Sequence, residues 1–361
     1  MAAARQVLIM CSSLEIDGHA FCLGLGAFKD LISQVAFLIQ NSIFRPREIS
    51  RGQQGRLSLD ICSLGELVDM YHAHDATKRH DKIYALLGMC SDDLSAAHLG
   101  PDYNLPWMLL MQRLVHFLLG QYISVDTWNE RETAVIRSKG CVLGKVSTVD
   151  VNNSLADGQN VEAIIKRSSG CGISGSAPWR LRTSAKHVKN GDVICLLKGA
   201  FKPTVVRLQE DYFIIIMIAA VPPEDIRTKD GEIEWLELVQ SASFIRDFVL
   251  VWDWETSLGN TQELGQYNAL IQRHNLQPHA GTKLENDMES SIRTWNVAQI
   301  LGDLGEFSES AEMSQKAKSF FSGRGSGKAP AFSRMPMQPD TAIMDCKLWR
   351  RCISRHPTCE R

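Results

Sequence analysis

The chain has 361 residues, which is long enough for about two or three domains. It carries 39 basic and 41 acidic residues, so its formal net charge of −2 gives no support to a nucleic-acid-binding role. A hydrophobic fraction of 44% and a charged fraction of 22% are ordinary for globular proteins, so we expect most of the chain to be ordered.

Nothing in the sequence predicts a membrane span or a secretory signal. The longest wholly apolar run, residues 213–223, is about half as long as a bilayer requires. Ten cysteines are present, and most lie in apolar runs such as the one around Cys195. This pattern favours reduced core thiols in an intracellular protein. We therefore expect a cytoplasmic protein that makes no contact with a membrane.

The N-terminal part of the chain predicts one strand and two helices. Residues 7–11 form a short apolar run that is typical of a buried strand. Apolar residues follow helical spacing over 28–41. A second helix is predicted over 58–70, with Ser58 as its N-cap.

Several potential metal ligands follow this second helix: His72, His74, Asp75, His80 and Asp81. The two close histidines are two positions apart, a spacing that places side chains on one face only in a strand. The segment instead predicts a helix end and a loop, and its spacing matches no common metal-binding motif. We predict no metal site and no cofactor here.

The chain is organised around residues 76–103, the central stretch, in which a charged head is joined to an apolar run. The head consists of Arg79, His80, Asp81 and Lys82, and the apolar run covers 83–89. This arrangement places the head at the rim of a core. There, we expect Asp81 to accept hydrogen bonds from backbone N–H groups or to pair with a cation.

Beyond this stretch, the sequence predicts a helix over 107–119, with Pro106 in its first turn. A strand is expected at 122–125. The polar segment 126–138 is interpreted as a domain boundary.

The middle of the chain predicts an antiparallel, barrel-like β module. Short β-rich runs separated by Gly or Asp turns occupy 141–149, 193–197, 204–208, 212–220 and 248–255. Near its end, Trp252 and Trp254 flank Asp253. Such a pair could form a stacking platform for a ligand, but tryptophans more often anchor a strand in a core, and we expect the second role.

The last element that the sequence predicts is a helical hairpin over 285–321, with its turn at 304–306. It resembles a tetratricopeptide (TPR) hairpin, in which Leu301 and Phe307 would fill the space between the helices. One hairpin cannot bury its own faces, so it must dock on the preceding module or on a partner. The Pro-, Gly- and Ser-containing residues 322–361 are predicted to be a disordered tail.

The central stretch resembles the R-D-K-[IV]-Y-A-L-L-G-L signature and the following P-D-Y of fungal heterokaryon incompatibility (HET) domain proteins. His80 stands where the family carries Arg. The residues that carry this resemblance, including two downstream runs, are His80, Asp81, Tyr84, Gly88, Pro101, Asp102, Tyr103, Gly191, Asp192, Trp252, Asp253 and Trp254. The family's upstream motifs are absent, so the chain resembles the C-terminal portion of a HET protein.

The residues predict an α+β protein, and together with the resemblance they divide it into four parts. These are the C-terminal part of a HET-like domain with a TIR-like α/β fold (1–125), a β-rich module (139–256), the TPR-like hairpin (285–321) and the tail (322–361).

The resemblance also implies a signalling or interaction protein of fungal non-self recognition, associated with programmed cell death. Its protein partners would bind through 290–321, and a shortened chain could be inactive. The alternatives are a non-catalytic TPR scaffold and a TIR-like enzyme that cleaves NAD, for which Glu15 and Glu66 are the early candidates. No catalytic arrangement is legible from the residues, so catalytic residues stay unknown and an enzyme is the less favoured expectation.

Overall fold

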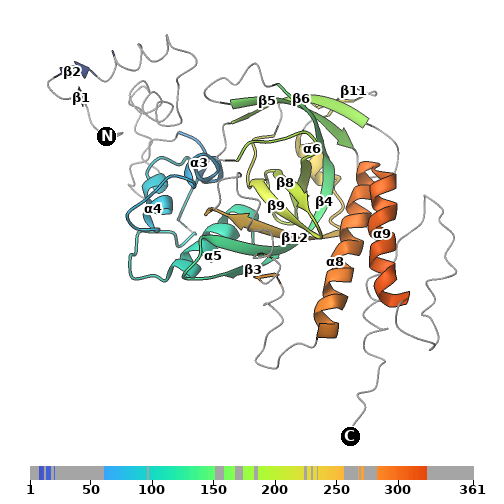
Figure 1. Cartoon of the computed structure of the whole chain (residues 1–361). Helices are drawn as coiled ribbons and strands as arrows, with labels where there is room; N and C mark the ends of the chain where they lie inside the picture. The colour runs from blue at the N-terminus through green and yellow to red at the C-terminus, as the bar shows by residue number, and fades with distance from the viewer. Residues whose placement is uncertain are drawn as a thin grey trace, which may run out of the picture. The chain divides into compact units, whose positions relative to one another are not determined.

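The computed structural model describes residues 8–11, 14–17, 20, 61–95, 97–150, 158–166, 174–182, 186–222, 226–228, 231–233, 235–255, 267, 270–271 and 283–322. Within these residues the protein is mixed α+β, with one large sheet and six helices, which confirms the predicted α+β class (Figure 1). The predicted helix over 28–41 and the tail after Ser322 lie outside the described residues. None of the described helices is long and apolar enough to cross a membrane.

The strands of the large sheet follow one another in the middle of the chain. They are β3 (Ile123–Thr127), β4 (Thr133–Val149), β5 (Gly158–Lys166), β6 (Ser174–Arg182), β7 (Val193–Leu197), β8 (Thr204–Gln209), β9 (Tyr212–Met217), β10 (Ile226–Thr228), β11 (Gly231–Ile233) and β12 (Arg246–Asp253). A separate antiparallel hairpin consists of β1 (Leu8–Cys11), where a strand was predicted, and β2 (Leu14–Asp17).

Five of these strands close into a ring of pairings. β4 pairs with β12 and also with β7, while β7, β8 and β9 form a meander. The parallel pairing of β9 with β12 completes the ring, and the other four pairings are antiparallel. In a closed ring of this kind, each of the five strands has a neighbour on both sides.

The long strand β4 makes closure possible by changing partners along its length. Its first half lies between β3 and β12, and its second half lies between β5 and β7. The register of the β7 pairing shifts between Val142 and Gly144. A Cβ atom at Gly144 would lie 2.0 Å from the carbonyl oxygen of Ile164, so only glycine allows β5 to approach so closely.

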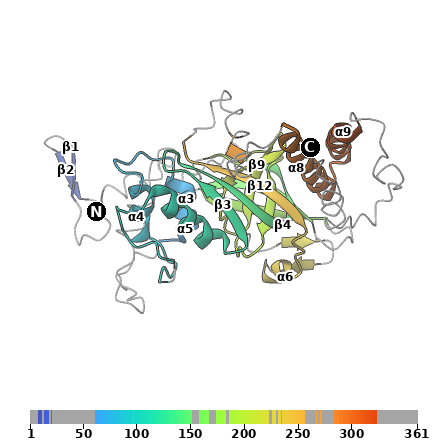
Figure 2. The same ribbon diagram turned by 90° about the horizontal axis from the view of Figure 1, so that it is seen from below.

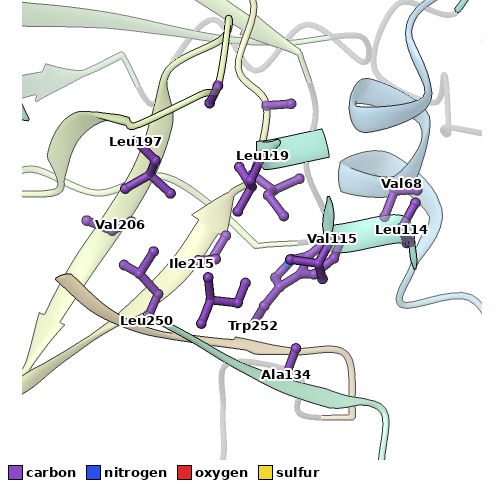
Figure 3. Close-up of a cluster of buried hydrophobic side chains, with 14 of the residues drawn as sticks. Val68, Leu114, Val115, Leu119, Ala134, Leu197, Val206, Ile215, Leu250 and Trp252 are labelled. Atoms are coloured by element: carbon purple, nitrogen blue, oxygen red, sulfur yellow. The ribbon is translucent and has the colours of Figure 1, made fainter. Parts of the chain in front are cut away.

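Alternate residues of β7 face two different hydrophobic cores, which explains why this strand is apolar throughout. Val193, Cys195 and Leu197 belong to one core cluster, whereas Ile194 and Leu196 belong to another. The first cluster also contains apolar residues of the N-terminal helices. Figure 3 shows Val68, Leu114, Val115 and Leu119 from those helices together with barrel residues such as Leu250 and Trp252.

The N-terminal helices are α3 (Leu64–Tyr71), α4 (Asp81–Leu87) and α5 (Trp107–Leu119). Helix α3 begins later than predicted, and its N-cap is Ser63 rather than Ser58. The reason is a capping box: the Ser63 hydroxyl accepts from the backbone N–H of Glu66, and the Glu66 carboxylate accepts from the N–H of Ser63. Helix α5 has the predicted bounds and directly follows Pro106.

The segment 126–138, interpreted as a boundary, is instead the β3–β4 hairpin, because β4 already begins at Thr133. Strands β5 and β6 and the short helix α6 (Trp235–Gln240) were not predicted.

The C-terminal helices α8 (Lys283–Leu304) and α9 (Phe307–Ser322) lie side by side, on a different side of the barrel from α3–α5 (Figures 1 and 2). Helix α8 contacts β12, β4 and β9. The predicted turn is present, with Gly305 at a φ of 78°. Leu301 is buried as expected, but Phe307 is 74% exposed, so the expectation that it fills the space between the helices is wrong.

A tight joint connects α3 with the end of β9. A Cβ atom at Gly65 would lie 2.5 Å from the Cβ of Ala219, so only glycine fits at this crossing. Four residues further along α3, the buried carboxylate of Asp69 accepts hydrogen bonds from the backbone N–H groups of Ile218 and Ala219, at 2.9 and 3.2 Å. The helix is thus fixed to the barrel by close packing and by hydrogen bonds.

The joint predicts different losses of stability for substitutions at two glycines, one within α3 and one at the end of α4. Gly65→Ala should destabilise the protein by about 1–3 kcal/mol, because the added methyl group overpacks the crossing. Gly88→Ala is the matched control: its φ is −75° and nothing lies within 4 Å of an added Cβ, so its effect should be within about 1 kcal/mol. Urea denaturation of both variants measures the difference, and equal losses would contradict the joint.

Candidate functional site

The charged head of the central stretch binds the loop between β3 and β4. The guanidinium of Arg79 donates to the carbonyl oxygens of Asn129 (2.7 Å) and Glu130 (3.0 Å). The ammonium of Lys82 donates to the Glu132 carboxylate at 2.5 Å, and Arg79 lies 3.4 Å from the other carboxylate oxygen. Arg79, in the turn before α4, and Lys82, in α4, therefore both bind the loop between β3 and β4.

Glu132 connects this head to a second barrel strand. Its backbone N–H donates to the Glu255 carboxylate at 2.7 Å, and its carbonyl oxygen accepts from the N–H of Trp254 at 3.0 Å. The side chains of Glu132 and Lys82 are each only 10% exposed. Because water is largely excluded, this ion pair is less screened than a surface pair. Glu132 is the residue at which α4, β4 and the end of β12 meet.

The aromatic residues of the stretch form the second half of the same site. His80 donates from Nε2 to the carbonyl oxygen of Leu105 at 2.8 Å, and the Tyr84 hydroxyl donates to the carbonyl oxygen of Asp102 at 2.9 Å. The rings of Tyr84 and Tyr103 meet edge to face at 5.4 Å. These contacts tie α4 to the segment that carries Pro101, Asp102 and Tyr103.

The partner of Asp81 differs from our expectation. Its carboxylate accepts from the Tyr103 hydroxyl at 2.5 Å, not from a backbone N–H group, and no cation is paired with it among the described residues. The carboxylate raises the pKa of Tyr103, which keeps the phenol protonated. Tyr103 is half exposed, and the Lys78 ammonium lies 4.9 Å from its ring centroid.

The two tryptophans near the end of β12 pack in the core. Trp252 and Trp254 are 1% and 3% exposed, and their rings meet edge to face at 5.0 Å. Trp254 also packs against Trp107 and His72. These side chains lie inside the barrel–helix core and leave no aromatic face open to a ligand.

Asp253, between the tryptophans, is almost completely buried and holds several elements together. Its carboxylate accepts from the hydroxyl groups of Thr133 (3.0 Å) and Tyr267 (2.6 Å). Its carbonyl oxygen accepts from the buried ammonium of Lys186 at 2.7 Å. Burial lowers the pKa of Lys186 to about 8, and burial together with the nearby Lys186 lowers the pKa of His72 to about 4. His72 is therefore neutral at physiological pH.

Gly191 and Asp192 form a separate cluster on the barrel. Gly191 adopts a φ of 88° in the turn before β7. The buried Asp192 accepts from the backbone N–H of Lys189 at 2.7 Å and from the guanidinium of Arg207 at 2.7 and 2.8 Å. This two-pronged pair fixes the turn to β8.

The structure separates the remaining predicted residues from one another. Pro101 is exposed, and Gly88 ends α4. Glu15 lies exposed on the β1–β2 hairpin, whereas Glu66 caps α3 and accepts from Lys202 at 3.1 Å. Among the described residues, no group of three or more His, Cys, Asp and Glu side chains is placed to hold a metal ion.

Sequence reasoning missed Glu132 and Lys186. The only signal for Glu132 was its place in the polar segment 128–132, and its partners lie about 50 and 120 positions away in the chain. Comparison with family models, curated proteins and solved structures finds no match to this chain.

The buried ion pair predicts a measurable coupling. Glu132→Gln or Lys82→Met should each cost about 2–3 kcal/mol of stability, because each leaves one charge of the pair buried. The double variant should lose at least about 1 kcal/mol less than the sum. The exposed pair Lys139–Asp247, at 45% and 38% exposure, is the matched control and should show coupling below about 0.5 kcal/mol. Equal coupling in both pairs would contradict the special role of Glu132.

Asp69 predicts a pH dependence of stability. Burial raises its pKa from 3.8 to about 7 in the folded protein, so the folded state retains a proton that the unfolded state has lost. The contribution of Asp69 to the free energy of unfolding is therefore largest below about pH 4. It falls by a few kcal/mol, in order of magnitude, as the pH rises to about 7. The surrounding charges are Glu66, which raises the pKa, and Lys202, which lowers it.

The Asp69→Asn variant cannot ionise at this position and should lose this slope. The stability of the wild type relative to the variant, measured by denaturation at intervals between pH 4 and pH 8, should therefore fall with rising pH. A constant difference over this range would mean that Asp69 does not titrate there.

Proposed function

We propose that this protein is a signalling or interaction protein of the HET type, acting in fungal non-self recognition, and that its central stretch is a structural junction with no bond-breaking role. The observation that carries the proposal is how the polar side chains of the stretch are used. Arg79, His80, Lys82 and Tyr84 each contact another part of the same chain, and Asp81 binds Tyr103. A catalytic cluster would instead converge on one open position.

The helical hairpin supports the interaction role. Its helix α8 is held to the barrel by Arg293–Asp211 at 2.9 Å and by Arg246–Asp303 at 2.6 Å. The turn after α8 is held by an ion pair between Lys145 and Glu306. Apolar residues of α8, such as Val297 and Leu301, join the core that α3–α5 and the barrel share. The hairpin and the junction therefore share one hydrophobic core, and in the proposed mechanism this core couples them.

The outer face of α9 is the part of the hairpin that a protein partner would meet. Its exposed residues are Phe307, Ser308, Glu309, Ala311, Glu312, Gln315, Lys316, Lys318 and Ser319. A partner that binds α9 more tightly when α8 has shifted on the barrel would bias the protein toward a second state, as any signalling mechanism of this kind requires. Isolated 290–321 would expose the docking face of α8, so binding studies call for the full chain.

Among the residues that the structure describes, the contacts of Glu66 and Glu15 do not favour the enzymatic alternative. The Glu66 carboxylate accepts from the backbone N–H and hydroxyl of Ser63 and from Lys202. These contacts give it a role in capping α3 and in joining α3 to the barrel. Glu15 lies on a hairpin that contains no second predicted site residue.

The test is inducible expression of the full chain in a filamentous fungus, with growth and cellular NAD measured together. The wild type should arrest growth without a prior fall in NAD. Glu132→Gln should abolish arrest at equal protein level, whereas Asp247→Asn, which disrupts the exposed control pair, should not. Unaffected growth with the wild type would overturn the proposal, and NAD loss before arrest would support the enzyme instead.

A further inference from the structure

Two buried cysteines are backbone partners where the segment before α3 meets the segment after α4. Cys62 and Cys90 are direct partners in an isolated parallel β-bridge. Backbone hydrogen bonds hold the bridge on both sides: Ile61 donates to Met89, and Ser91 donates to Cys62, each at 2.9 Å. Neither residue is in a disulfide in the structure, and the Cys90 thiol donates to the carbonyl oxygen of Leu87 at 3.4 Å.

The geometry of a β-bridge suits a disulfide. Neighbouring strands lie about 4.8 Å apart, and partnered residues direct their side chains to the same side. A disulfide requires Cα atoms roughly 4.4–6.8 Å apart, so the bridge already brings the two residues within range. The bridge is isolated, so no longer strand ladder continues beyond the two backbone hydrogen bonds that flank it.

We propose that Cys62 and Cys90 form a reversible, redox-sensitive disulfide that closes the loop carrying the charged head and its contacts with the barrel. The loop it would close, from 62 to 90, contains α3, the charged head and α4. The same loop carries Gly65, Asp69 and Lys82, which make the contacts with the barrel described above. The inference rests on the bridge alone and does not require the proposed function.

The reaction is balanced with a peroxide as oxidant. One thiolate attacks a peroxide oxygen, the O–O bond breaks, and a sulfenic acid forms; the departing hydroxide takes up the proton that the thiol had lost and becomes water. The second thiolate attacks the sulfenic sulfur, the S–S bond forms as the S–O bond breaks, and the second departing hydroxide takes up the proton of the second thiol to give a second water. The two sulfur atoms together supply the two electrons that reduce the peroxide. Cys62 and Cys90 are 8% and 2% exposed, so a small oxidant is the suitable class.

The chain supplies its own control pair. Cys141 and Cys195 are also buried thiols on neighbouring strands, β4 and β7. Their strand partners are Leu196 and Val142, so they do not face each other. They also belong to different hydrophobic clusters. Oxidation directed by the fold should join the first pair of cysteines and leave the second pair as thiols.

The test is a thiol map of the wild-type full chain. The protein is treated with hydrogen peroxide. It is then denatured in the presence of N-ethylmaleimide, which alkylates the remaining thiols, and digested without reduction. We expect one linked peptide pair containing Cys62 and Cys90, with a mass about 2 Da below the sum of the two peptides. We also expect a rise in melting temperature of about 5 °C, since a loop of about 30 residues is closed, and reversal by dithiothreitol.

Cys62→Ser and Cys90→Ser should each abolish the rise in melting temperature, whereas Cys141→Ser should keep it. Recovery of Cys62 and Cys90 as two alkylated peptides would overturn the proposal. An equal yield of the linked pair from protein unfolded in guanidinium would overturn it too, since the fold would then not direct the reaction. The wild-type map decides the question even if a serine variant fails to fold.

Discussion

The arrangement of this protein depends on the buried ion pair between Lys82 and Glu132. Lys82 lies in the first turn of α4, and Glu132 lies just before the long strand β4. The backbone of Glu132 is bonded in turn to Trp254 and Glu255 at the end of β12. Glu132 therefore links α4 to two strands of the barrel. A buried pair of this kind is costly to break from one side, so it specifies one docking geometry.

The other contacts between the helices and the barrel depend on that geometry. Gly65 and Asp69 meet the end of β9 only if α3 crosses the barrel at one position, because the glycine leaves no room for a shift and the carboxylate needs both backbone N–H groups. The aromatic contacts of Tyr84 and Tyr103 then hold the rim. The central stretch is thus a junction whose residues act together, and this is the property on which the proposed signalling role rests.

The sequence was informative where local pattern decides structure. The spacing of apolar residues predicted α5 with its correct bounds, and the Gly and Asp turns predicted the meander β7–β9. The capping box Ser63-Glu66 was also legible, but we placed the cap at Ser58. Strand β6 was missed because it contains Gly175 and Pro178, which are unfavourable in a strand. Phe307 was misjudged because the resemblance to a TPR hairpin, not the burial of this helix, suggested its role. The contacts of Glu132 with α4 and with the end of β12 could not be predicted, because they join segments that lie far apart in the sequence.

The most direct measurement of the junction is hydrogen–deuterium exchange of the full chain, compared between wild type and Glu132→Ala. If the ion pair holds the helices on the barrel, amides of α4 should exchange at least about tenfold faster in the variant. Amides of β8, far from Glu132 in the ring of pairings, should keep their wild-type rates. Unchanged exchange in α4 would show that the helices stay in place without Glu132, and it would contradict the account of the central stretch as a junction.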